Sequence, residues 1–170
     1  MSAMPGAAWR GGAAAPGVEW SRSGAVRAVE LSWQMSFAPV LETPARVRAE
    51  LREWLDKQAW PAGQAQALVY AVNEAVSNAV EHAYPVVGFA GGVVRVSAEL
   101  AEAAGERRAR IRVADDGWWR PRVEPLGPPE HLGLDLIEAV MDRVWLRRGE
   151  VGMPGTEIVM LSPPAADVPS

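Results

Sequence analysis

The feature that most constrains this chain is a long segment between Pro61 and Pro85 in which apolar residues recur at helical spacing. At about 100° per residue, the apolar positions share one wide arc of a helix and the polar positions share the opposite arc. The apolar arc holds Leu68, Val72, Val76, Ala79 and Val80, and the polar arc holds Glu74, Ser77, Asn78, Glu81 and His82. Such a helix must bury its apolar arc against another layer. We therefore expect a helix from about residue 64 to 84.

The rest of the chain predicts a sheet for this helix to cover. Alternating apolar residues predict a half-buried strand over 26–37, and Thr43, as N-cap before Pro44 at the first helical position, predicts a helix that ends before Pro61. Further on, the pattern predicts strands at 93–100 and 109–114 around a turn at 102–107, a loop at 117–131, a helix at 132–141, and strands at 144–147 and 156–161 joined by a Gly-rich hairpin. This order predicts an α+β, two-layer sandwich with a mixed or antiparallel sheet and helices on one face.

Composition changes near both ends of the chain. Residues 1–24 are rich in Gly, Ala, Pro and Ser without periodicity, and they predict a disordered tail. We expect one folded domain over 25–162 and a short tail over 163–170.

The inventory of residues excludes several function classes. The chain has no cysteine, and His82 and His131 are its only histidines, so a Cys-based or His-rich metal site is excluded. Lys57 is the only lysine and does not follow a Gly-rich turn, which excludes a P-loop. The net charge of −4 does not indicate the excess of basic residues that binding to nucleic acid or an anionic membrane requires. Without a long apolar run or a signal peptide, we expect a cytoplasmic protein with no membrane segment.

Glu74, Asn78 and His82 are spaced at i, i+4 and i+8, so they stack on one line of the predicted helix. An ordinary solvated face is the simplest explanation of such a line. Against it, no Lys or Arg follows Glu74 or Glu81 at i+4, as on a salt-bridged solvent face. A carboxamide oxygen is a suitable ligand for Mg²⁺, and a carboxylate one turn away can accept a proton.

Three further short motifs have ordinary explanations when each is taken alone. Asp115-x-Gly117 after a strand is a common turn, Gly133 can start a core helix, and Gly155-Thr156 can enter a hairpin. Their order after the polar helix makes the set more specific than any one of them.

Together these motifs resemble those of the GHKL, or histidine-kinase-like, ATPases. Residues 72–84 resemble the N-box, 115–117 the G1 box, 133–137 the G2 box, and 155–160 the last box. The sequence Asn-Glu-Ala-x-x-Asn-Ala-x-x-His-Ala-Tyr, which ends at Tyr84, and the Trp118-Trp119-Arg-Pro segment resemble the anti-sigma-factor serine/threonine kinase branch. The resemblance implies a Bergerat-type ATP-binding fold.

The resemblance also implies roles for individual residues toward ATP and Mg²⁺. Asn78 would hold Mg²⁺ on the phosphates, and Glu74 would be the catalytic base. Asp115 would accept the adenine amino group, with Thr156 joining through a water. The remaining implied nucleotide contacts are Gly117 at the ring, and His131, Gly133 and Leu134 near the phosphates. His131 stands where the family usually has a glycine.

The implied function is an ATP-dependent serine/threonine kinase that phosphorylates an antagonist (anti-anti-sigma) protein and sequesters a sigma factor. A nucleotide- or partner-binding module without turnover is the alternative. A full sensor histidine kinase is less favoured, because no helical hairpin with a phosphoacceptor histidine precedes residue 72 in this sequence. The resemblance leaves open a homodimer.

Overall fold

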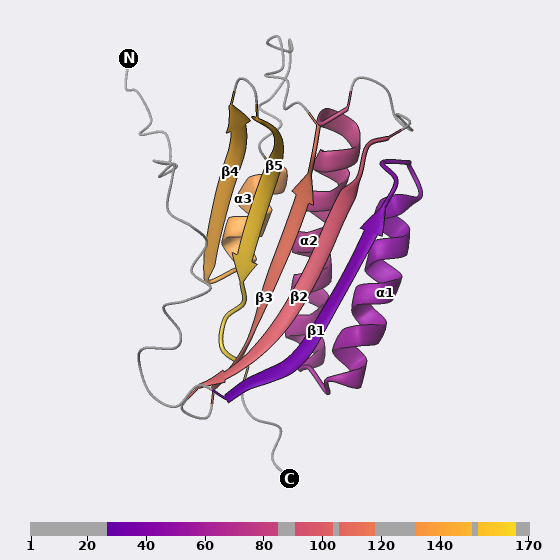
Figure 1. The fold of residues 1–170 in the computed structure, drawn as a ribbon. Helices are drawn as coiled ribbons and strands as arrows, with labels where there is room; N and C mark the ends of the chain where they lie inside the picture. Colours follow the sequence, from indigo (N-terminus) through magenta and orange to yellow (C-terminus); the bar gives the residue numbers. More distant parts are fainter. Residues whose placement is uncertain (1–26, 85–90, 104–105, 118–131, 151–152, 166–170) are drawn as a thin grey trace, which may run out of the picture.

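The computed structural model describes residues 27–84, 91–103, 106–117, 132–150 and 153–165. Within these ranges the elements in chain order are β1 (Arg27–Phe37), α1 (Thr43–Lys57), α2 (Ala62–His82), β2 (Val94–Ala103), β3 (Glu106–Asp115), α3 (Leu132–Val140), β4 (Arg143–Glu150) and β5 (Met153–Leu161) (Figure 1). The predicted 1–24 tail and 117–131 loop lie outside the described residues, except for Gly117.

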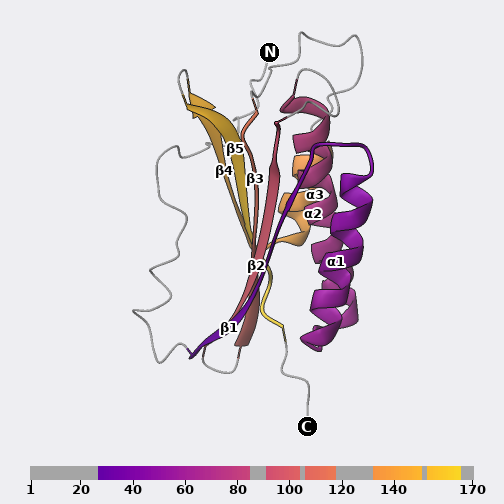
Figure 2. The same cartoon turned by 45° about the vertical axis from the view of Figure 1, so that its right-hand side comes forward.

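The strands form one sheet in the order β1-β2-β3-β5-β4, and every neighbouring pair is antiparallel. β2 with β3, and β4 with β5, are consecutive along the chain. The three helices α1, α2 and α3 lie together on one face of the sheet (Figure 2). The structure therefore confirms the α+β sandwich with helices on one face, and it decides the sheet direction as antiparallel.

The core lies between the helices and the side of the sheet that they cover, and α2 contributes much of it. Side chains of β2 alternate as a half-buried strand requires, and the buried set is Val94, Val96, Ala98 and Leu100. The predicted apolar arc of α2 is buried along its whole length: Leu68, Val72, Val76, Ala79 and Val80. Burying a Val or Leu side chain contributes about 1.5–3 kcal/mol. This arc therefore holds α2, and the polar residues on its other side, in a set position on the sheet.

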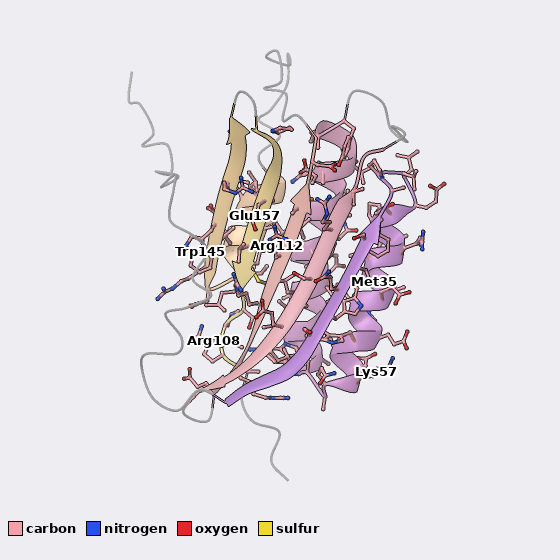
Figure 3. The ribbon with its side chains drawn as sticks, in the orientation of Figure 1. Met35, Lys57, Arg108, Arg112, Trp145 and Glu157 are labelled. Carbon is pink, nitrogen blue, oxygen red and sulfur yellow. The ribbon has the colours of Figure 1, made fainter. Side chains whose placement is uncertain are left out.

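The opposite face of the sheet carries charged side chains that pair across strands. Arg112 of β3 and Arg147 of β4 both donate to Glu157 of β5, the latter at 3.1 Å (Figure 3). Burial opposes the ionisation of Glu157, but the hydrogen bonds from the two arginines hold its pKa below the ordinary value. In the part of the chain that the structure describes, this face carries ion pairs between strands, and the helices lie on the other face.

The start of α1 differs from the prediction. Thr43 is the first helical residue rather than the N-cap, which is Glu42, and no side chain caps the helix. The buried Thr43 hydroxyl instead donates to the carbonyl oxygen of Ala38, 2.6 Å away. A threonine near a helix start can bond either the helix or the preceding backbone, and packing of the β1–α1 connection selects the second.

The turn predicted at 102–107 is shorter in the structure. Glu102 pairs with Arg107, and Ala103 pairs with Glu106, so the β2–β3 ladder continues to both sides of residues 104–105. Pairing with β1 supports this extension, because Arg27 lies opposite Glu102. The glycine in this segment indicated a turn, but cross-strand partners decide where the strands end.

The chain after β5 packs back onto the domain. Gln64 donates to the carbonyl oxygen of Pro164 at 3.0 Å, and the buried Ala165 pairs with the backbone of Arg107. The predicted domain boundary at residue 162 stays a prediction, while residues 163–165 lie against the domain.

Candidate functional site

The polar line of α2 is half-buried rather than fully solvated. Glu74, Asn78 and His82 all have intermediate exposure, and they lie on the side of α2 away from its buried arc. The Asn73 amide donates to one Glu74 carboxylate oxygen at 3.4 Å. The other Glu74 oxygen, Oε2, faces α3. The polar line is therefore not an ordinary solvated face of α2, because α3 packs beside it.

Gly133 brings the start of α3 against both Glu74 and Asn78. A Cβ atom at Gly133 would lie 3.1 Å from Glu74 Oε2 and 3.5 Å from Asn78 Nδ2. A glycine leaves this approach free, whereas a Cβ atom here would require the Glu74 carboxylate to shift by a few tenths of an ångström. Gly133, more than fifty positions further along the chain, therefore meets Glu74 and Asn78 in one place. Leu134 packs against the core, and His131 lies outside the described residues.

Asp115 at the end of β3 forms a second part of the site. It is 8% exposed, and its Oδ1 accepts hydrogen bonds from the backbone N–H groups of Gly117, at 3.0 Å, and Thr156, at 3.3 Å. Burial raises the pKa of Asp115 to about 6, although these two N–H groups favour the carboxylate. The Thr156 hydroxyl is buried, and Oγ1 has no hydrogen-bond partner among the described residues.

Glycines hold the Asp115 turn against its neighbours. A Cβ atom at Gly117 would overlap the carbonyl oxygen of Ala83 at the end of α2. Gly155 has φ +114°, which L-residues rarely adopt, and its N–H donates to the carbonyl oxygen of Gly117 at 2.7 Å. The turn, the start of the last motif and the end of α2 are therefore in direct backbone contact.

The site has two parts, and α2 spans both. Asn78 and Glu74 belong to the α3 side, and Ala83 touches the Asp115 side. Asn78 and Ala83 are separated by about 7 Å along the helix axis. The structure thus brings together Glu74, Asn78 and Gly133 in one part, and Asp115, Gly117 and Thr156 in the other.

One contact beside the site could not be predicted from the sequence, and it joins two residues. Tyr84 and Asp116 bond to each other beside the Asp115 turn. Tyr84 was visible as the last residue of the His-Ala-Tyr motif, and Asp116 as the middle of Asp-Asp-Gly. Neither spacing indicated that the two would meet, because residues 85–115 lie between them.

A family model described as the histidine kinase-like ATPase domain matches residues 37–161. The chain belongs to the histidine kinase-like ATPase domain family. The match includes every described residue of the site just outlined. ATP is therefore the ligand that this ATPase domain is expected to bind.

This histidine kinase-like ATPase domain can be compared with two solved structures. The crystal structure of the RsbU and RsbW domains of Rv1364c from Mycobacterium tuberculosis superposes with a TM-score of 0.61 at 24% identity, covering 82% of this chain and 34% of that chain. The histidine kinase domain from Erythrobacter litoralis EL346 blue-light activated histidine kinase has a TM-score of 0.43 at 24% identity, covering 61% of this chain and 46% of that one. The chain spans about a third of the first protein's length, and that likeness establishes the fold.

Two features of this ATPase domain fit an adenine nucleotide. The buried Thr156 hydroxyl beside Asp115 has no hydrogen-bond partner among the residues that the structure describes, and a buried polar group of this kind usually has one. At the other part, Gly133 leaves space beside Glu74 and Asn78 that a Cβ would fill. Among the residues that the structure describes, no helix is long and apolar enough to cross a membrane.

Proposed function

We propose that this domain binds Mg²⁺-ATP at the two-part site and transfers the γ-phosphoryl group to a serine or threonine of an antagonist protein. The observation that carries the proposal is the placement of Glu74 and Asn78 on consecutive turns of α2, with Gly133 of α3 against both. Phosphoryl transfer requires positioned phosphates, a metal and an oriented acceptor hydroxyl. This placement supplies a metal ligand and a proton acceptor side by side.

The Asn78 carboxamide oxygen would hold Mg²⁺ on the phosphates. In the described part of the chain, no three His, Cys, Asp or Glu residues cluster to form a metal site. A single protein ligand suits Mg²⁺, which often keeps several waters and binds through substrate phosphates. The metal would supply charge neutralisation there, and Asp115 with Thr156 would hold the adenine.

Glu74 is suited to accept the proton of the acceptor hydroxyl. As that oxygen bonds to the γ-phosphorus, the bond between the γ-phosphorus and the leaving ADP oxygen breaks, and the hydroxyl proton passes to the carboxylate. Among the described side chains, no Arg or Lys forms an ion pair with Glu74. No described cation therefore holds the Glu74 carboxylate in an ion pair that would compete with accepting a proton.

We place the domain in regulation of a sigma factor on the resemblance of residues 73–84 to the anti-sigma kinase branch. The fold likeness to a structure whose name includes an RsbW domain supports this placement. The acceptor would then be a small antagonist protein, and the domain would also bind the sigma factor.

Variants of Glu74 and Asn78 test the proposal, because the two residues have different proposed roles. We expect Glu74→Ala to keep Mg²⁺-ATP binding while transfer of ³²P from [γ-³²P]ATP to an antagonist protein encoded nearby falls by roughly 10²–10⁴-fold. Asn78→Ala should lose both Mg²⁺-dependent binding and transfer. Neither residue belongs to the buried arc, so nucleotide-free melting temperatures should hardly change.

Two outcomes would contradict the proposal, one for Glu74→Ala and one for the parent protein. If this variant phosphorylates the partner as fast as the parent, Glu74 is not the base. If the parent binds ATP but leaves it intact with every antagonist tested, the domain is a binding module. His131, in place of the usual glycine, is the feature that favours this second function.

A further inference from the structure

The Tyr84 hydroxyl lies at the junction of three segments. Two acceptors lie within reach of its proton, Asp116 Oδ1 at 2.6 Å and the carbonyl oxygen of Val93 at 2.9 Å, and the shorter contact to the charged carboxylate is the favoured one. The hydroxyl oxygen accepts from the N–H groups of Val93, at 3.0 Å, and Asp116, at 3.3 Å. The Val93 N–H also reaches Asp116 Oδ1 at 3.0 Å. One hydroxyl thus joins the end of α2, the start of β2 and the residue after β3.

The ring of Tyr84 is packed as closely as its hydroxyl is bonded. Tyr84 is 7% exposed, and a Cβ atom at Gly92 would lie 2.6 Å from its ring. Burial and the bond to Asp116 raise the pKa of Tyr84, so it stays a neutral donor. Burial works against the Asp116 carboxylate, but the bonds from Tyr84 and Val93 hold the pKa of Asp116 below its ordinary value.

This junction lies beside the adenine end of the site. Asp116 stands between Asp115, which the proposed function assigns to adenine, and Gly117, whose Cα meets Ala83. Two consecutive residues of the α2 end, 83 and 84, therefore contact two consecutive residues of the turn, 116 and 117. A charge-assisted hydrogen bond of this kind is stronger than a neutral one, and it ties the turn to the helix that carries Asn78.

We propose that Tyr84 is a positioning residue: by holding Asp116, it keeps the Asp115 carboxylate at a constant place relative to α2. The inference rests on the proposed function, because it works through the contact of Asp115 with adenine. Tyr84 itself touches no substrate. Its effect is on nucleotide affinity and not on the transfer step.

Tyr84→Phe tests the inference because it removes the hydroxyl and keeps the packed ring. We expect ADP affinity, measured by calorimetry, to fall about ten-fold, because the turn that carries Asp115 loses the hydroxyl that holds it. The KM for ATP should rise by the same factor, with kcat within about two-fold of the parent. Asp116→Ala, which leaves the ring packing untouched, should show the same loss. Asp116→Asn keeps an acceptor oxygen and should restore most of the affinity.

Two control variants test whether a loss of ADP affinity is specific to the Tyr84 hydroxyl. Tyr70→Phe changes the only other tyrosine, which lies on α2 and is 54% exposed. Arg95→Ala removes the exposed pair with Asp116, 3.5 Å apart, and such pairs contribute little. Both should bind ADP as the parent does.

A double-mutant cycle with Asp115→Asn separates positioning from general loosening. In the Asp115→Asn background, Tyr84→Phe should change ADP affinity by less than about two-fold. An equal ten-fold loss in both backgrounds, or no loss in either, overturns the inference. If the parent itself binds neither ADP nor ATP, the proposed function fails first, and the inference fails with it.

Discussion

At the scale of single residues, Asp115 shows how the proposed site differs from an ordinary surface turn. Its carboxylate is 8% exposed, and both N–H groups that reach it bond the same oxygen, Oδ1. Burial therefore raises the pKa of Asp115 to about 6 from 3.8. The folded protein binds this proton more tightly than the unfolded chain does. The resulting stabilisation is complete below pH 3.8 and is lost as the pH rises through about 6.

Replacing Asp115 should separate stability from binding. Asp115→Asn keeps an oxygen for the Gly117 and Thr156 N–H groups and removes the buried charge. We expect the nucleotide-free variant to be more stable than the parent at pH 8, by up to about 3 kcal/mol, and the difference to shrink below pH 6. The same variant should bind ATP more weakly by roughly 1–3 kcal/mol. Urea titrations at pH 5 and pH 8, with calorimetry at pH 8, measure both effects. A variant that loses stability at pH 8 would show that the Asp115 carboxylate is structural.

At the scale of elements, two glycines let helices approach their neighbours, with different consequences. The Gly133 Cα faces Glu74 Oε2, the far end of a flexible side chain. The Gly117 Cα faces the backbone carbonyl of Ala83, which cannot rotate away. The α2–α3 contact can therefore adjust by moving a functional side chain, whereas the contact of α2 with the Asp115 turn cannot.

Matched alanine substitutions should reveal this contrast. Gly133→Ala should change the free energy of unfolding by less than about 1 kcal/mol, because alanine's better helix propensity offsets the tight contact. It should still reduce phosphoryl transfer, since the Glu74 carboxylate must shift. Gly117→Ala should lower stability by more than about 2 kcal/mol, because backbone must move. Thermal melts and transfer assays of both variants check the pair. Full phosphoryl transfer by Gly133→Ala would contradict a role for Glu74 Oε2 in the reaction.

At the scale of the whole molecule, the sheet and the helical layer on it bring both parts of the site against one helix, α2. The buried arc of α2 attaches it to the sheet, and its other side carries Glu74 and Asn78. The end of α2 meets the turn after β3. That turn also contacts the start of β5, because the Gly155 N–H donates to the carbonyl oxygen of Gly117. A nucleotide that bridges both parts would bind only to the folded arrangement and would stabilise it.

The rise in melting temperature that a nucleotide causes should depend on its nucleobase and on whether Mg²⁺ is present. At ATP and Mg²⁺ concentrations about 100-fold above the dissociation constant, binding adds about 2.7 kcal/mol. For a domain of this size that corresponds to a rise in melting temperature of roughly 5–10 °C. ATP without Mg²⁺ should give a smaller rise. GTP should give little, because guanine has an acceptor where adenine donates to Asp115. Equal shifts with ATP and GTP in a thermal-shift assay would contradict the assignment of Asp115.

The sequence alone determined the features that depend on local periodicity and on short motifs. The spacing of apolar residues over 64–84 predicted α2 and its buried arc, and the alternation over 26–37 predicted β1. The order of the motifs around Glu74, Asn78 and Asp115 indicated the histidine kinase-like ATPase family, which the family match confirms. These signals are readable because helix and strand geometry repeat every few residues along the chain.

Only the tertiary structure decided what depends on contacts between distant segments. It placed Gly133 against Glu74 and Asn78, paired β3 with β5, extended the β2–β3 ladder, and turned the Thr43 hydroxyl away from the helix it was expected to cap. The bond from Tyr84 to Asp116 likewise joins residues 32 positions apart. No local pattern encodes such pairs, because each is set by how whole elements pack, and a side chain takes the partner that packing brings within hydrogen-bonding distance.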